Sequence, residues 1–159
     1  MTTTTTAIPE GAHGATPYVC CTNAPRALEF YQKAFGATEV MRLVEPSGKI
    51  GHAEIRIGAA LVMLSDEYPD MGMCSPQTLG GSPVTIHLYV EDVDAFASRA
   101  VAAGATLLRP IADQFYGDRA GTLVDPFGHR WMIATRKEEV SSAEMQTRYD
   151  RLMKQQGPG

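Results

Sequence analysis

Apolar and polar positions along the chain recur with two periods, one typical of helices and one typical of strands. Between residues 26 and 35, apolar side chains recur at helical spacing, and Gly36 follows as a helix-ending residue. Segments rich in β-branched and apolar residues, bounded by turn residues, predict strands on both sides of this helix. The strands expected in the first half of the chain are 16–22, 39–45, 50–57 and 60–65.

The second half of the chain repeats this order of elements about 70 residues later. A strand over 84–90 precedes a helix over 93–103, which ends at Gly104 as the first helix ends at Gly36. Further strands are expected over 106–110, 121–124 and 130–134. Neither half could bury its apolar sheet face alone. We therefore expect an α+β fold in which two tandem βαβββ modules form a curled, open mixed sheet, with helices outside and a cavity inside.

The connecting segments complete the expected organisation. A segment rich in Pro and Gly separates the two modules and is long enough to act as a flap. Ser141 and Glu144 form a capping-box pattern, which predicts a last helix that ends near Lys154. The expected parts are a disordered N-terminal tail (1–13), a first module (14–66), a linker or flap (67–83), a second module (84–138) and a C-terminal helix and tail (139–159).

Composition narrows the class of protein. The chain has 159 residues, of which 44% are hydrophobic and 20% charged, as in an ordinary globular domain. Its formal net charge of −4 disfavours nucleic acid or an anionic membrane as a partner. No apolar run approaches the roughly 18–20 residues that span a bilayer, and the threonine-rich N-terminus lacks the features of a secretory signal. We therefore expect a cytoplasmic protein whose cysteines, Cys20, Cys21 and Cys74, stay reduced.

Alternation along the strands sorts the side chains onto two faces. One face is apolar and should pack against the helices, with Val19, Ala53, Ile55, Trp131 and Ile133 among its members. The other face mixes polar, aromatic and thioether groups, which suits a small-molecule pocket, although a merely solvated face is the alternative. With two loop residues added, the candidate ligand-binding residues are Tyr18, Cys20, His52, Glu54, Arg56, His87, Tyr89, Tyr116, Arg119, Arg130 and Met132.

Several short motifs point to a known family. The first helix contains Phe30-Tyr31, and the strands after it carry HAEIRIG and LVMLSD. The second helix opens with VEDVD, and YGDR and DPFGHRW follow. With these motifs, the segment from about residue 16 to residue 136 resembles the glyoxalase / bleomycin-resistance / extradiol-dioxygenase (vicinal oxygen chelate) superfamily. The resemblance implies the paired βαβββ fold, a pocket in each curled sheet and usually a homodimer.

The same resemblance implies where a metal would be held. Metal-dependent members place ligands on the first and last strands of each module, and the corresponding positions here are Thr16, Val62, Thr85 and Met132. A divalent cation needs carboxylate or imidazole ligands, and the thioether of Met132 is a poor substitute. We therefore expect these positions to hold no metal and the protein to need no cofactor.

The leading hypothesis is a metal-independent protein that binds or sequesters a small, partly apolar molecule in its barrel cleft. One alternative is an enzyme of the lyase, isomerase or dioxygenase type. Such an enzyme would use a relocated divalent metal on His52, Glu54 and His87, or metal-free proton transfer by His52 and Glu54. A second alternative is a structural or interaction protein that works through its C-terminal helix.

Overall fold

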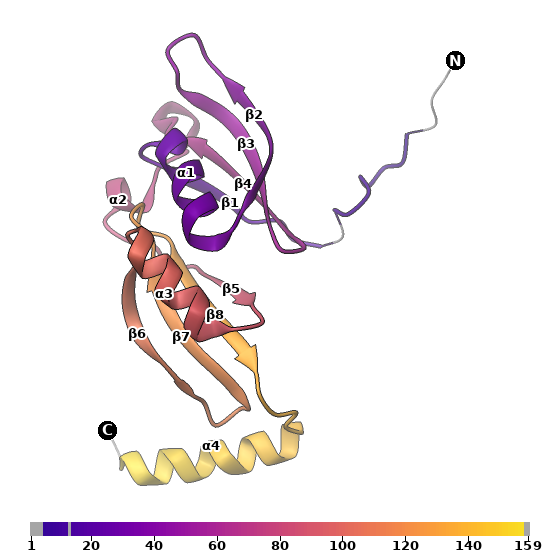
Figure 1. Ribbon diagram of the computed structural model, residues 1–159, viewed down its shortest axis with the longest axis vertical. Helices are drawn as coiled ribbons and strands as arrows, with labels where there is room; N and C mark the ends of the chain where they lie inside the picture. The colour runs from indigo at the N-terminus through magenta and orange to yellow at the C-terminus, as the bar shows by residue number, and fades with distance from the viewer. Residues whose placement is uncertain (1–4, 13, 158–159) are drawn as a thin grey trace. The chain divides into compact units, whose positions relative to one another are not determined.

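The computed structural model describes residues 5–12 and 14–157, and these divide into two compact units between Gly81 and Ser82 (Figure 1). The expected N-terminal tail falls partly outside the described residues, since residues 1–4 and His13 are not among them. Residues 5–12 form neither a helix nor a strand. Within the described part of the chain, no helix has the length and apolar content needed to cross a membrane.

The first unit contains one helix and four strands. They are β1 (Tyr18–Cys21), α1 (Ala24–Phe35), β2 (Thr38–Val44), β3 (Ile50–Ile57) and β4 (Ala60–Asp66). The strands form a mixed sheet in the order β1-β4-β3-β2, in which β1 pairs with β4 in parallel and the other pairs are antiparallel. The parallel pair forms because β4, the last strand of the unit, lies beside β1 and runs in the same direction.

The second unit repeats this arrangement. Its elements are β5 (Thr85–Tyr89), α3 (Val93–Ala103), β6 (Thr106–Asp113), β7 (Asp118–Val124), β8 (Arg130–Arg136) and the C-terminal helix α4 (Ser142–Gln156). The strand order β5-β8-β7-β6 and the single parallel pair match those of the first unit. The predicted α+β fold, with two open four-stranded mixed sheets and a C-terminal helix, is confirmed.

Strand boundaries in the second unit differ most from the prediction at the end of β6 and at the start of β7. The strand expected to end at Pro110 continues to Asp113, because a register shift between Arg109 and Ala112 lets the proline enter β6 without breaking its pairing. Gly121 makes this possible, since a Cβ there would lie 2.8 Å from the carbonyl oxygen of Arg109. The strand expected over 121–124 begins earlier than predicted, because β7 already starts at Asp118.

Each sheet buries one face against its own helix, as Figure 1 shows for α1 and α3. The side chains predicted to face the helices are buried, among them Val19, Ala53, Ile55, Trp131 and Ile133. Both helices begin with a side-chain cap: Asn23 accepts a hydrogen bond from the backbone of Arg26, and Asp92 from that of Ala95.

A polar side chain at the end of the last strand fixes each helix to its sheet. In the first unit, the Asp66 carboxylate accepts hydrogen bonds from the backbone N–H groups of Ala24 (2.8 Å) and Ile50 (2.7 Å). In the second unit, the Thr135 hydroxyl accepts from the backbone N–H of Val93 (2.9 Å) and donates to Val90 (2.8 Å). Both side chains therefore satisfy the first N–H group of a helix, which has no partner within the helix itself.

The segment expected to be a linker carries structure of its own. It contains the short helices η1 (Pro69–Met71) and α2 (Pro76–Leu79), and an isolated bridge pairs Tyr68 with Met73. The segment is therefore folded against the first unit and contributes side chains to it.

The C-terminal helix α4 is fixed to the second unit by its middle turn. Arg148 forms ion pairs with Glu138 (2.7 Å) and Glu144 (2.9 Å) and donates to the carbonyl oxygen of Phe115 (3.2 Å). The ring of Tyr149 lies 5.5 Å from that of Phe115. These contacts connect α4 to the turn between β6 and β7.

We expect Asp66→Ala to lower the free energy of unfolding by about 2–4 kcal/mol, because it leaves two buried N–H groups without an acceptor. Thr135→Val, which removes a single hydroxyl, should cost about 1–2 kcal/mol. Urea unfolding followed by circular dichroism measures both changes. Asp70→Ala, at an exposed position, serves as the control, and an equal loss of stability in that variant would contradict the assignment.

Candidate functional site

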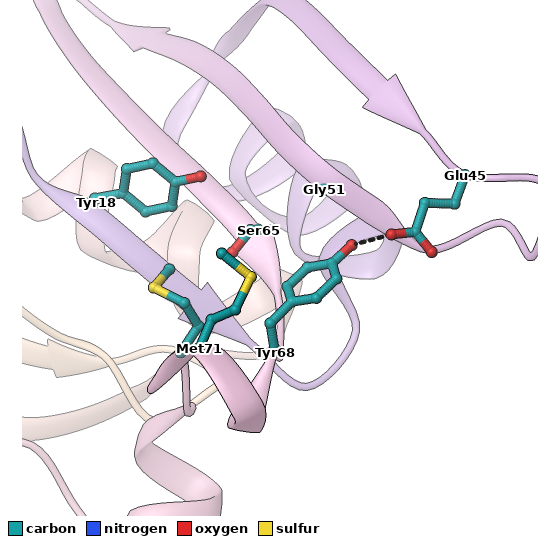
Figure 2. A pocket seen from close by; sticks show the side chains of 7 residues that line it. Tyr18, Glu45, Gly51, Ser65, Tyr68 and Met71 are labelled. Atoms are coloured by element: carbon teal, nitrogen blue, oxygen red, sulfur yellow. Dashed lines mark hydrogen bonds between the residues drawn. The ribbon is translucent and has the colours of Figure 1, made fainter.

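A pocket of about 530 Å³ lies in the first unit. Strand alternation places two of its strand residues, Tyr18 and Ser65, on the face of the sheet opposite α1, where Ser65 is the neighbour of Cys20 across the β1–β4 pair. Aromatic and thioether side chains make up much of its wall (Figure 2). The lining residues are Tyr18, Glu45, Gly51, Ser65, Tyr68, Met71 and Met73.

The sheet forms the floor of the pocket and the segment after β4 forms one wall. In Figure 2, Tyr18 and Tyr68 lie on opposite sides of Met71. The bridge between Tyr68 and Met73 closes the short loop that carries Met71. The Tyr68 hydroxyl lies 3.5 Å from the position that a Cβ at Gly51 would take, which is an ordinary contact distance.

Tyr68 is held in place by two charged groups. Its hydroxyl donates a 2.7 Å hydrogen bond to the Glu45 carboxylate, and the ammonium group of Lys49 lies 3.9 Å from the centre of its ring. The hydrogen bond to Glu45, with a contribution from burial, raises the pKa of Tyr68 to about 12. The phenol therefore stays protonated at physiological pH and presents its ring to the pocket.

Tyr18, which lines the pocket, also belongs to a chain of three hydrogen-bonded side chains. Its hydroxyl lies 2.8 Å from Nδ1 of His52, and Nε2 of the same imidazole lies 3.1 Å from the Glu54 carboxylate. The structure thus brings together three of the residues predicted for the site. It leaves the imidazole with a partner at both nitrogens.

Two other candidates in the first unit have different surroundings. Cys20 is buried, and its thiol donates to the carbonyl oxygen of Asp66 at 3.6 Å. Burial, together with the nearby Glu67 carboxylate, raises the pKa of Cys20 to about 11. Arg56 is exposed on β3, near Gly11 of the N-terminal segment.

The aromatic candidates of the second unit lie in side-chain clusters of their own. The ring of His87 lies 4.7 Å from that of Tyr89, whose hydroxyl donates to Asp118 at 2.7 Å. That hydrogen bond raises the pKa of Tyr89 above its usual range. Tyr116 packs edge-on against Phe115, and burial likewise raises its pKa.

The remaining candidates of the second unit divide between ion pairs and strand positions. Arg119 forms a bidentate pair with Asp94 (2.7 and 3.0 Å) and a further contact with Asp113 (3.2 Å), so its guanidinium is already occupied by two carboxylates. Met132 pairs with His87 across β5 and β8. Nε of Arg130 is buried and has no hydrogen-bond partner among the described atoms.

The family model described as Glyoxalase/Bleomycin resistance protein/Dioxygenase superfamily matches residues 13–133. The chain belongs to this superfamily.

Three relatives illustrate the membership. The Mycobacterium tuberculosis protein Rv0887c is 44% identical over 146 residues, which make up 90% of this chain and 84% of that protein. The solved Arabidopsis thaliana gene product At5g48480 has a TM-score of 0.62 at 26% identity, covering 76% of this chain and 97% of that one. The fosfomycin resistance protein FosX from Listeria monocytogenes, solved with Mn(II) and sulfate, has a TM-score of 0.60 at 16% identity, covering 87% and 98%. FosX shows the shared fold alone.

The positions at which metal-dependent superfamily members hold their metal need one correction. Val62, expected to be one of them, is buried on the helix side of β4, where it pairs with Ile55. Met63 is the open-face residue instead, since it pairs with Tyr18 as Met132 pairs with His87. Met63 carries a thioether, which is no hard ligand for a divalent cation, just as the aliphatic side chain of Val62 is not.

Of the residues expected for the relocated metal site, His52 and Glu54 lie in the first unit and His87 lies in the second. Both imidazole nitrogens of His52 already have hydrogen-bond partners, so metal binding would break one of these bonds. Within either unit taken by itself, no three His, Cys, Asp or Glu side chains among the described residues gather closely enough to hold a metal ion. The four positions that the resemblance assigns to the metal, with Met63 in place of Val62, carry no imidazole or carboxylate.

Most of the pocket wall was missed by sequence reasoning. Tyr68, Met71 and Met73 lie in the segment treated as a linker, and Glu45 lies next to a turn. The Pro- and Gly-rich composition of the linker marked it as a possible flap, and that was the one signal available. It did not indicate which of its side chains face the sheet.

In the folded protein, we expect iodoacetamide at pH 8 to alkylate Cys74 well before Cys20 and Cys21. Cys74 is partly exposed, whereas the other two cysteines are buried. The thiolate is the reactive form, and a pKa of about 11 leaves roughly one Cys20 thiol in a thousand ionised at pH 8. Peptide mass spectrometry over time measures the order, with protein unfolded in guanidinium as the control. Labelling of Cys20 as fast as Cys74 in the folded protein would contradict the observed burial.

Proposed function

We propose that this superfamily member binds a small, uncharged aromatic molecule in the pocket of its first unit, without a metal ion. The observation that carries the proposal is the pocket itself, in which two tyrosines and two methionines surround a space of about 530 Å³. This volume lies within the range typical of small-molecule sites.

The composition of the wall favours a flat apolar ligand. Tyr18 and Tyr68 present aromatic rings, and aromatic pairs contribute about 0.5–1.5 kcal/mol beyond the area they bury. Met71 and Met73 add flexible, polarisable side chains that adapt to different ring shapes. Met71 is 78% exposed, so a ligand would cover apolar surface that water now contacts.

The charges at the pocket are already satisfied, which favours an uncharged ligand. One oxygen of the Glu45 carboxylate accepts from Tyr68, and the other lies 3.4 Å from the Ser47 hydroxyl. The Lys49 ammonium lies against the ring of Tyr68. A charged ligand would lose its hydration without gaining a free counter-charge from these groups.

Sequestration of such a molecule requires only equilibrium binding, and the four positions at which metal-dependent members hold a metal carry no imidazole or carboxylate here. Superfamily membership and the pocket both support a binding role.

We expect 2-naphthol, a neutral flat probe, to bind the full-length protein saturably. Tyr68→Ala should weaken this binding about 10-fold, equivalent to about 1.4 kcal/mol of lost ring contact and burial. The probe's fluorescence, titrated against protein, gives the dissociation constant. Tyr149→Ala, which removes a tyrosine of α4 in the second unit, is the matched control and should leave the constant unchanged.

Two charged analogues of the same ring system test the class of ligand. 2-Naphthoate and 2-(aminomethyl)naphthalene should each bind at least about 5-fold more weakly than 2-naphthol. Their charged groups would lose water on binding, while Glu45 and Lys49 are already engaged with Tyr68. Failure of 2-naphthol to saturate, or equal loss of binding in both tyrosine variants, would refute the proposed site.

A further inference from the structure

Tyr18, His52 and Glu54 form a row of hydrogen-bonded side chains. Such a row can transfer a proton, which simple binding does not require. The carboxylate of Glu54 accepts hydrogen bonds, so in the neutral imidazole the proton lies on Nε2. Nδ1 is then an acceptor, and the Tyr18 hydroxyl donates to it. The carboxylate therefore fixes the tautomer in which the imidazole can receive the phenol's proton.

The residues around His52 and Glu54 favour proton transfer over a merely structural ion pair. Among the described residues, the Glu54 carboxylate has its hydrogen bond to His52 and no ion pair with lysine or arginine. Its cross-strand neighbours are Met41 and Met63, and that of His52 is Leu43. With apolar neighbours on adjacent strands, the carboxylate is well placed to stabilise an imidazolium when one forms.

The second unit shows that the fold does not require these side chains. Thr122 pairs with Met132 on β8 as Glu54 pairs with Met63 on β4, and Ala120 stands two residues before it, in the place of His52. The position of Tyr18 is taken by His87. A sheet of the same order forms there without the hydrogen-bonded chain, so folding alone does not account for it.

The geometry points to a general-base relay at the pocket of the first unit, in which Tyr18 removes an acidic C–H proton from a bound aromatic ketone. Tyr18 is the catalytic residue, because it lines the pocket, whereas His52 receives the phenol's proton and Glu54 is a positioning residue. This inference rests on the proposed function, since the ketone must first bind in that pocket.

The step is balanced without any further reactant. The ketone's α-proton passes to the phenolic oxygen of Tyr18 while the phenol's own proton passes to Nδ1 of His52. The C–H electron pair becomes the C=C bond of the enolate, with the negative charge on the former carbonyl oxygen. Return of a proton along the same path restores the ketone, or gives its tautomer when the proton returns to another atom.

The probe is 2-tetralone, a neutral flat ketone with acidic protons at C1, incubated with full-length protein in buffered D₂O. Proton NMR follows deuterium exchange at C1, and a ligand titration gives the dissociation constant for each variant. We expect the protein to accelerate exchange over buffer. Tyr18→Phe and His52→Gln should each lose about 100-fold of that acceleration with dissociation constants within about 3-fold of wild type.

Glu54→Gln tests positioning. It should lower the exchange rate at saturating ketone about 10-fold while the dissociation constant and the melting temperature stay close to wild type, a split that a merely structural role would not give. Tyr149→Phe is the matched control, because Tyr149 is 44% exposed and Tyr18 45%, and it should exchange at the wild-type rate.

The outcomes separate the two proposals. If 2-tetralone does not bind, the proposed function fails together with the relay. If it binds but exchange stays at the buffer rate, or if Tyr18→Phe exchanges as fast as wild type, the relay is overturned and the binding role stands.

Discussion

The hydrogen bonds from the end of each unit's last strand to the beginning of its helix are the constraint on which the rest of this structure depends. Asp66 and Thr135 each satisfy the first helical N–H, and so fix the helix to the edge strand pair that β1–β4 or β5–β8 forms. A buried N–H without an acceptor costs about 1–3 kcal/mol, so the helix lies where this partner is available. Once the helix covers one sheet face, the other face is left for function.

What covers the other face depends on the chain that follows the last strand. After β4, the segment with Tyr68, Met71 and Met73 forms a wall of the pocket on the open face of the first sheet. After β8, residues 137–140 instead pack on the turn at Gly117, where a Cβ would come within 2.8 Å of the Val140 side chain. The two units therefore share a sheet and a helix but differ in what their final strand leads to.

The sequence predicted what depends on local periodicity. The repeat, both helices and the buried face of each strand follow from residue spacing. Contacts between distant residues were not predictable in this way: Arg119 pairs with Asp94, 25 residues away. Val62 was chosen because it lies four residues after Gly58, as Met132 lies four residues after Gly128. The open-face residue is instead Met63, one position further along. Two residues separate β3 from β4, whereas five separate β7 from β8, so the same count ends on opposite faces.

The two units differ in the side chains on the open face of their sheets. Each sheet needs a buried face and a hydrogen-bonded helix start in order to fold, and both units have them. The open face is under no such demand, and it is there that His52 and Glu54 stand opposite Ala120 and Thr122 in the repeat. A hydrogen-bonded imidazole and carboxylate beside apolar neighbours have a desolvation cost, which the second sheet avoids. Their presence in the first sheet alone, beside its pocket, is what a site for ligand chemistry requires.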